Sequence, residues 1–248
     1  MTGSRVYRIA ILTDGETWMN EFMPGLVNTW VAQGHEVQWT HELTDLQGGD
    51  FAFFLSVERK VPSSTRALYR NCLVVHESDL PRGRGWSPMT WQVLEGQSEI
   101  PIVLFEAVDE IDAGTIYLSD VIVLDGSELV DELRAAQAAS TIALCSNFVR
   151  RFPAVLEGGR PQRGEASLYR RRRPIDSELD PNRTICEQFN LLRVVDNQRY
   201  PAYVRMGKCT YELQIRKLED APGRSTATNG KTGPAPAWEK HLERSVDD

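Results

Sequence analysis

Histidine chemistry has few places to occur in this chain, because the sequence contains only four histidines, at positions 35, 41, 76 and 241. His76 follows the apolar run 72–75 and precedes a loop rich in glycine and proline at 81–85. The next apolar run, 100–105, is followed by an acidic turn that contains Asp112. An imidazole and a carboxylate at the ends of neighbouring strands can exchange a proton. A single histidine is more often a surface or core residue, but His76 and Asp112 together form a candidate centre for acid–base chemistry.

The elements that must position these two residues are indicated by the hydrophobic pattern. Apolar runs at 6–12, 51–57 and 72–76 and the short segment 36–40 predict strands. Between the first two, Phe22, Leu26 and Trp30 recur at helical spacing. Strands that alternate with helical segments predict an α/β fold with a Rossmann-like, doubly wound and mostly parallel sheet. In such sheets ligands bind where strands end and loops begin, which is where His76 is expected.

The remaining chain predicts three regions. Ser127 is the expected N-cap of a long helix that runs to about Arg150 and closes a catalytic domain at 1–155. A helix at about 184–196 and a hairpin at 203–215, with its turn at 206–208, predict a small C-terminal α+β region at 156–218. The segment 219–248 is rich in Pro, Gly, Ser and Thr and is expected to be a flexible tail.

Composition excludes several classes of function. The formal net charge is −7, which disfavours a nucleic-acid partner because phosphate neutralisation needs basic surface. No run approaches the roughly 18 apolar residues of a membrane span, and the N-terminus does not resemble a secretory signal, so we expect a cytoplasmic protein without a membrane partner. The four cysteines are scattered, which argues against a metal site or a disulfide framework. A homodimer is compatible with the sequence, which does not fix the oligomeric state.

The segment that begins at His76 carries a motif. From His76 to Pro88 the sequence runs HESDLPRGRGWSP, and residues 111–114 are Ile-Asp-Ala-Gly. These stretches resemble the H-x-S-x-L-P-x-x-R-G-x-x-P and I-D-x-G signatures of folate-dependent N-formyltransferases, which share the methionyl-tRNA formyltransferase-like fold. Within that family the chain is most similar to the amino-sugar and sugar-nucleotide N-formyltransferases. The resemblance spans about residues 6 to 215 and is strongest from 76 to 114.

The resemblance implies an enzyme that transfers a formyl group from N10-formyltetrahydrofolate to an amine, with tetrahydrofolate as the product and no metal. It implies that Asp112 accepts a proton from the amine and orients His76. His76 would stabilise the oxyanion and help to protonate the departing folate nitrogen. The residues implied to contact the folate are Lys60, Val61, Ala107, Val108 and Asp109.

The acceptor is indicated by comparison within the family. Glycinamide ribonucleotide formyltransferases carry a Gly/Ser-rich phosphate loop where this chain has the acidic and bulky turn 13–18. Methionyl-tRNA formyltransferases add a basic C-terminal domain, which this acidic chain does not match. The resemblance therefore favours the amine of a nucleotide-linked amino sugar. The expected substrate contacts are Ser78, Trp18, Trp86 and Arg172, of which the tryptophans could stack on a ring and the arginine could meet a phosphate. The run 170–173 is equally consistent with a solvated or internally paired arginine cluster.

One position departs from the family pattern. An asparagine usually stands two residues before the histidine, where its amide helps to hold the oxyanion, whereas this chain has Val74. Valine cannot donate a hydrogen bond, and loss of one such donor costs about 2.7–4 kcal/mol. This departure keeps open a non-catalytic folate-binding or regulatory protein. A formyltransferase that acts on another amine, such as a carrier-bound amino acid or methionyl-tRNA, also remains an alternative.

Overall fold

The computed structural model describes residues 5–218. The described residues as far as Gln214 form one compact unit, and residues 215–218 are assigned to a second one. The expected flexible tail, 219–248, lies outside the described residues. Among residues 5–218, no helix has the length and apolar character needed to cross a membrane.

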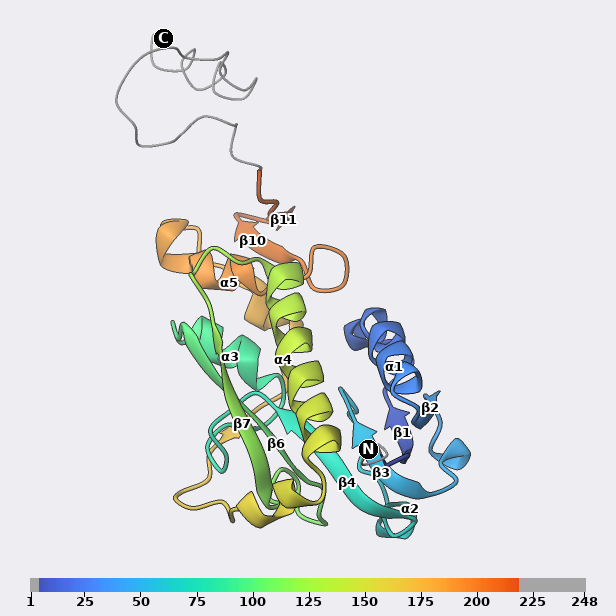
Figure 1. Ribbon diagram of the computed structural model, residues 1–248. Coiled ribbons are helices and arrows are strands. Elements are labelled where there is room, and N and C mark those ends of the chain that lie inside the picture. Colours follow the sequence, from blue (N-terminus) through green and yellow to red (C-terminus); the bar gives the residue numbers. More distant parts are fainter. Residues whose placement is uncertain (1–4, 219–248) are drawn as a thin grey trace, which may run out of the picture. The chain divides into compact units, whose positions relative to one another are not determined.

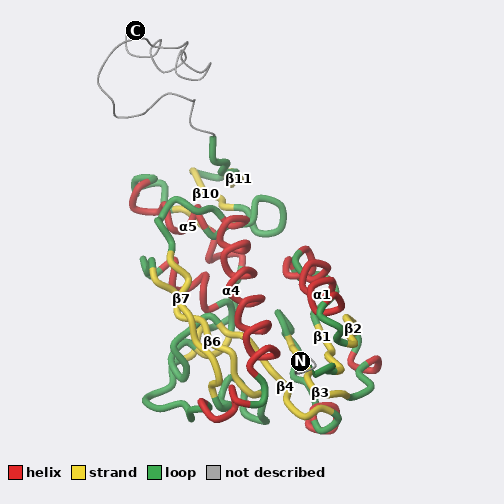
Figure 2. Tube along the Cα trace, in the orientation of Figure 1, coloured by secondary structure: helices red, strands yellow, loops and turns green. Residues whose placement is uncertain are grey.

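A six-stranded sheet forms the centre of the first unit, with the order β2-β1-β3-β4-β6-β7 (Figures 1 and 2). Its strands are β1 (Arg8–Leu12), β2 (Glu36–Thr40), β3 (Gly49–Phe54), β4 (Tyr69–His76), β6 (Glu99–Glu106) and β7 (Ile116–Val123). The strands from β2 to β4 pair in parallel, whereas β6 and β7 are antiparallel to their neighbours. The predicted α/β fold with a mostly parallel sheet is therefore confirmed.

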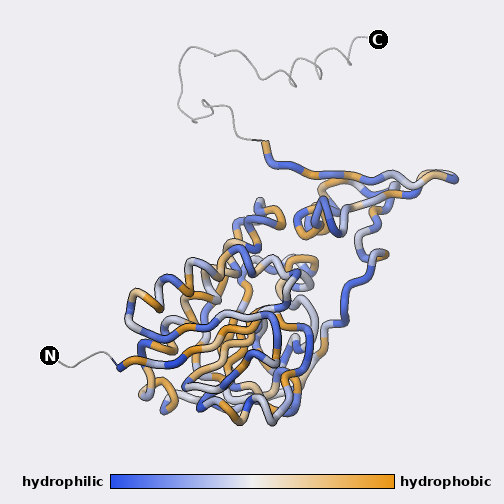
Figure 3. The backbone as a smooth tube through the Cα atoms, turned by 90° about the vertical axis from the view of Figure 1, so that its right-hand side faces the viewer, coloured by the Kyte–Doolittle hydropathy of each residue, from blue (hydrophilic) through white to orange (hydrophobic). Residues whose placement is uncertain are grey.

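The two long helices, α1 (Met23–Ala32) and α4 (Val130–Arg151), pack against the same face of this sheet. Alternate strand residues such as Ile9, Ile11 and Leu73 point into this core because side chains along a strand alternate between faces. From α1, Leu26 and Trp30 join them, as the helical spacing predicts. Figure 3 shows apolar segments gathered in the strands of the main body. Each such side chain contributes about 1.5–3 kcal/mol when it is fully buried, so this core anchors α4 to the sheet.

The opposite face of the sheet is covered by short elements. Leu12, Phe54 and Cys72 on this face pack against Val61 and Leu46. The segments that supply this cover include η2 (Leu43–Asp45) and α2 (Ser63–Arg66). Strand β4 therefore separates a helical side, which carries α4, from a side built of loops.

The start of α4 differs from the prediction. The helix begins at Val130 with Leu129 at the N-cap, so the expected N-cap at Ser127 is wrong by two residues. The carboxylate of Glu132 accepts a hydrogen bond from the Leu129 N–H at 2.9 Å. A side chain three residues into the helix thus satisfies the N-terminal backbone group, and a hydroxyl cap is not needed.

The predicted hairpin is present, and it lies within the first unit, which extends to Gln214. The hairpin consists of β10 (Ala202–Met206) and β11 (Cys209–Leu213), and Gly207 at its turn has a φ of 61°. A third short strand, β9 (Glu178–Leu179), pairs with β10. The remaining elements of this part of the chain are η3 (Ala154–Gly158), β8 (Leu168–Tyr169), η4 (Pro174–Ser177), η5 (Cys186–Gln188) and α5 (Phe189–Arg193).

The helix expected at about 184–196 is wrong in extent. Only the short η5 and α5 form there. Thr184 and Glu187 bond each other's backbone N–H groups, which fixes a turn at the start of the segment. At the other end, the Asp196 carboxylate accepts from the N–H groups of Gln198 and Arg199, so the chain turns instead of continuing the helix.

Candidate active site

His76 is the last residue of β4, and its ring is buried. Its Nε2 lies 2.8 Å from the carbonyl oxygen of Gly83. A carbonyl only accepts hydrogen bonds, so Nε2 must carry the proton in this contact. Gly83 has a φ of 71°, and a Cβ at that position would lie 2.9 Å from the Cβ of Ser78. A glycine is therefore needed for the loop to bring its carbonyl to the histidine.

Asp112 reaches the same place from the loop between β6 and β7. Its Oδ2 lies 3.9 Å from His76 Nε2 and accepts a hydrogen bond from the Gly85 N–H at 2.9 Å. The backbone of Asp112 has a φ of 52°, and its carbonyl accepts from the side chain of Gln162 at 2.8 Å. The carboxylate is therefore held in place by the loop after β4 and by a residue far along the chain.

The route of this loop could not be read from the spacing. Because β6 runs antiparallel to β4, Glu106 at the end of β6 pairs with Leu73 and not with His76. The loop starts where the Ala107 N–H donates to the Cys72 carbonyl. It then runs back along β4 to bring Asp112 level with His76. The two side chains are brought together, but by a returning loop and not by parallel strand ends.

The pair is shielded from solvent, since the side chains of His76 and Asp112 are 8% and 13% exposed. With Nε2 committed to Gly83, His76 can donate a second hydrogen bond only from Nδ1, and both nitrogens donate only in the imidazolium form. The arrangement places a hydrogen-bond donor beside a potential proton acceptor.

Two adjoining cavities open beside this pair. The first, here named the reaction cavity, measures about 300 Å³ and includes His76, Asp112 and Val74 in its lining. The second, here named the arginine cavity, measures about 450 Å³ and includes Arg134, Arg171, Arg172, Arg173 and Arg199. The residues that line both cavities are Trp18, Ser56, Glu58, Trp86, Ser87, Met89, Thr90 and Gln137. The two cavities therefore share a wall.

No family model matches the sequence. Among solved structures, a methionyl-tRNA formyltransferase from Clostridium thermocellum has a TM-score of 0.67 at 20% identity, covering 87% of this chain and 95% of that chain. HypX from Aquifex aeolicus in complex with tetrahydrofolic acid gives 0.64 at 16% identity, covering 81% of this chain but only 36% of HypX. A sugar N-formyltransferase from a Shewanella species gives 0.59 at 12% identity, covering 84% and 96%. The chain has the formyltransferase fold. The fold that the resemblance implied is thus confirmed.

Within this formyltransferase fold, three polar residues of the reaction cavity were not singled out by the sequence. Glu77 follows His76 and is buried, and burial raises the pKa of its carboxyl group, which also interacts with the side chain of Gln137. Thr141, one turn further along α4, is 1% exposed, and its hydroxyl has no hydrogen-bond partner among the described residues. Gln137 and Thr141 are more than 60 residues from His76 in sequence, and a helix pattern alone gave no sign that this face of α4 lines a cavity.

The predicted substrate residues are placed differently from one another. Trp18 and Trp86 line both cavities. The guanidinium of Arg171 lies 4.6 Å from the centre of the Trp86 ring, so one face of that ring is already covered. Ser78 is buried with an unpartnered hydroxyl, but it lines neither cavity.

Arg172 lines the arginine cavity and is held by the chain itself. It donates to the carbonyls of Asp176 and Val194 and to the Ser177 hydroxyl, while its buried Nε has no partner among the described residues. Burial lowers the pKa of Arg172. Arg172 is therefore held by hydrogen bonds within the chain, as the prediction of an internally paired cluster allows. Its Nε can still donate a hydrogen bond to a ligand.

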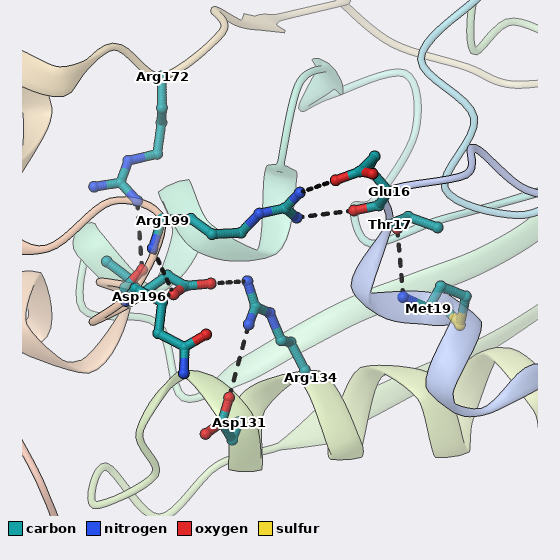
Figure 4. A network of polar contacts seen from close by, with 10 residues as sticks. Glu16, Thr17, Met19, Asp131, Arg134, Arg172, Asp196 and Arg199 are labelled. Carbon is teal, nitrogen blue, oxygen red and sulfur yellow. Dashed lines mark hydrogen bonds and ion pairs between the residues drawn. The ribbon is translucent and has the colours of Figure 1, made fainter.

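Three of the cavity's arginines form ion pairs with carboxylates. Figure 4 shows Arg134 between Asp131 and Asp196, and Arg199 on Glu16. The third is Arg171, which pairs with Glu58 at 2.9 Å. Within residues 5–218, Arg172 and Arg173 have no such ion pair. An anionic ligand in this cavity could therefore bind these two arginines without breaking an existing ion pair.

The five predicted folate contacts line neither cavity. Val61 and Ala107 pack into the apolar cluster on the loop side of the sheet, and Lys60 and Val108 are exposed. Asp109 forms an ion pair with Arg66. From the same two segments of the chain, Val57 and Ile111 do line the reaction cavity.

Proposed function

We propose that the protein is an N-formyltransferase that moves the formyl group of N10-formyltetrahydrofolate to the amine of a nucleotide-linked amino sugar. The observation that carries this proposal is the buried pair of His76 and Asp112, 3.9 Å apart in the lining of a cavity. The formyltransferase fold, shared with a structure that holds tetrahydrofolic acid, supports the donor. The fold alone does not select the acceptor, for which the arginine cavity supplies the argument.

In this proposal the tetrahedral intermediate forms beside the imidazolium of His76. His76 donates from Nδ1 to the developing oxyanion and protonates the departing folate nitrogen. Asp112 accepts the proton that the attacking amine loses. The hydrogen bond from the Gly85 N–H keeps the Asp112 carboxylate oriented during these steps.

The folate would enter from the loop side of β4. We assign the pterin ring to the backbone near Lys60 and Val61 and to the loop of Ala107, Val108 and Asp109, as the resemblance implies. Val57 and Ile111, which neighbour these segments and line the reaction cavity, would then contact the carrier near its reacting end.

The acceptor would occupy the arginine cavity. Its volume of about 450 Å³ falls within the usual range of roughly 300–1,000 Å³ for small-molecule sites. Arg172 and Arg173 would bind the nucleotide phosphates, since guanidinium groups bind phosphate through paired, charge-assisted hydrogen bonds. Trp18 and the uncovered face of Trp86 would contact a ring, and Ser78 would act only by supporting the loop at Gly83.

The test is turnover with N10-formyltetrahydrofolate and a panel of amino-sugar nucleotides that vary the nucleoside, the sugar and the ring position of the amine. Formation of the formamide is followed by mass spectrometry, and tetrahydrofolate by absorbance. Glycinamide ribonucleotide and methionyl-tRNA serve as comparison acceptors. A second candidate function is a folate-binding protein without turnover, which is favoured by Val74 because valine cannot donate a hydrogen bond to the oxyanion. That candidate predicts folate binding by calorimetry with no formamide from any acceptor.

A further inference from the structure

Glu77 is a buried carboxyl group beside the proposed reacting centre. Only 8% of the residue is exposed, and it lines the reaction cavity together with His76 and Asp112. Its backbone is fixed by Gln92, whose side-chain amide donates to the Glu77 carbonyl at 2.5 Å. A buried carboxylate is costly unless a partner compensates its charge, so its retention at this position calls for an explanation.

The side chain of Glu77 faces the helical side of the sheet. It interacts with Gln137 on α4, which lines both cavities. Val74, in contrast, packs against the apolar cluster on the loop side, with Ala107. The end of β4 therefore presents Glu77 to the side from which the arginine cavity opens.

We propose that Glu77 binds the ammonium group of the acceptor and removes its first proton, with Gln137 positioning the carboxylate. This inference rests on the proposed formyl transfer. It names a catalytic residue that neither the resemblance nor the His76–Asp112 pair supplies.

The protons of the reaction require such a group. An amino sugar arrives mainly as R–NH₃⁺, and its nitrogen has no lone pair until one proton is lost. Glu77 takes that proton, and the neutral amine then forms the new C–N bond to the formyl carbon. As the bond from that carbon to folate N10 breaks, N10 takes the Nδ1 proton of His76 and Asp112 takes the second amine proton, and proton exchange with solvent then restores both groups. The products are R–NH–CHO, tetrahydrofolate and one proton, which leaves from Glu77 to solvent.

Asp112 is less suited to the first of these tasks. Its Oδ2 already accepts from Gly85 and lies beside His76. The charged groups that act on Glu77 are His76 and Asp112, while Gln137, its contact from α4, is neutral. Burial, as the largest cause, raises the pKa of the Glu77 carboxyl, which makes its carboxylate a stronger base than that of an exposed glutamate.

The experiment compares two acceptors that differ in the charge of the amine. One is the amino-sugar nucleotide with the highest wild-type turnover, and the other is methoxyamine, which is neutral near pH 7. Glu77→Gln keeps the shape of the side chain, and Glu99→Gln, an exposed position on β6, is the matched control. We expect Glu77→Gln to lower kcat/KM roughly 100-fold or more with the sugar amine, in line with general-base catalysis. With methoxyamine we expect a change below about threefold, and Glu99→Gln should match the wild type with both.

An equal loss with both acceptors, or no loss with either, would overturn the role of Glu77 while leaving formyl transfer established by the wild type. Wild-type inactivity across the whole acceptor panel would overturn the proposed function and this inference with it. If Glu77→Gln fails to fold, the wild-type pH profiles decide. With the sugar amine, kcat/KM should fall as the pH drops through a range above that of an ordinary glutamate. The same decline with methoxyamine would refute the inference.

Discussion

Replacement of Asp112 by asparagine isolates the electrostatic part of the proposed mechanism. The asparagine side chain has the same size, and its Oδ1 can still accept the hydrogen bond from the Gly85 N–H. What disappears is a negative charge 3.9 Å from His76 Nε2. At an effective dielectric constant of about 20, two unit charges at about 4 Å attract each other by roughly 4 kcal/mol. Positive charge on the His76 ring in the proposed transition state loses stabilisation of that order.

Asp112→Asn should therefore lower kcat by roughly 10²–10³-fold, since about 1.4 kcal/mol corresponds to a factor of ten and the amide dipole retains part of the interaction. The affinity for N10-formyltetrahydrofolate, measured by calorimetry, should stay within about threefold, because the charge acts on the transition state. Asp120→Asn, the same substitution at an exposed position of β7, is the control. Near-normal kcat in Asp112→Asn, or a loss explained wholly by weaker folate binding, would refute the reasoning.

Three further predictions concern the acceptor side and stability. Arg173→Met should raise the KM of the amino-sugar nucleotide about 10–100-fold at unchanged kcat, because a charge-assisted hydrogen bond of that strength is lost. Steady-state kinetics measures this change, and an unchanged KM would contradict the prediction. Thr141→Val should raise the Tm, because it removes a buried hydroxyl without a described partner; a lower Tm contradicts this. The Arg170 guanidinium lowers the pKa of Asp176 from 3.8 to about 2, so Asp176→Asn should melt earlier than wild type above about pH 4. That difference should shrink as the pH falls from about 4 through about 2, and a gap that stays constant over this range would count against the ion pair.

The parts of the fold that follow local rules were predictable. Strands β1, β3 and β4 contain apolar runs because parallel central strands are buried on both faces. The hairpin at Gly207 follows from turn chemistry, since its φ of 61° suits glycine. Such signals lie within a few residues of each other, so one sequence contains them in full.

Features that depend on distant residues were not predictable in this way. The antiparallel direction of β6 and the returning loop to Asp112 depend on pairing with β4, which leaves no local mark. The start of α4 was misplaced because Glu132, inside the helix, provides the cap that was expected from Ser127. Glu77 stood next to the predicted histidine, but its role depends on burial against Gln137, 60 positions later.

Val74 increases the dependence of the proposed chemistry on His76. Its side chain contributes to the apolar clusters that contain Phe54 and Phe105, where an amide would lose apolar contacts. The residue at the position that usually supports the oxyanion therefore has no side-chain donor, and Nδ1 of His76 must donate the hydrogen bond to the oxyanion instead. Because Nε2 is committed to Gly83, Nδ1 can donate only while the ring is charged. A chain with valine at this position should therefore depend on Asp112 more strongly than one in which an asparagine shares the oxyanion.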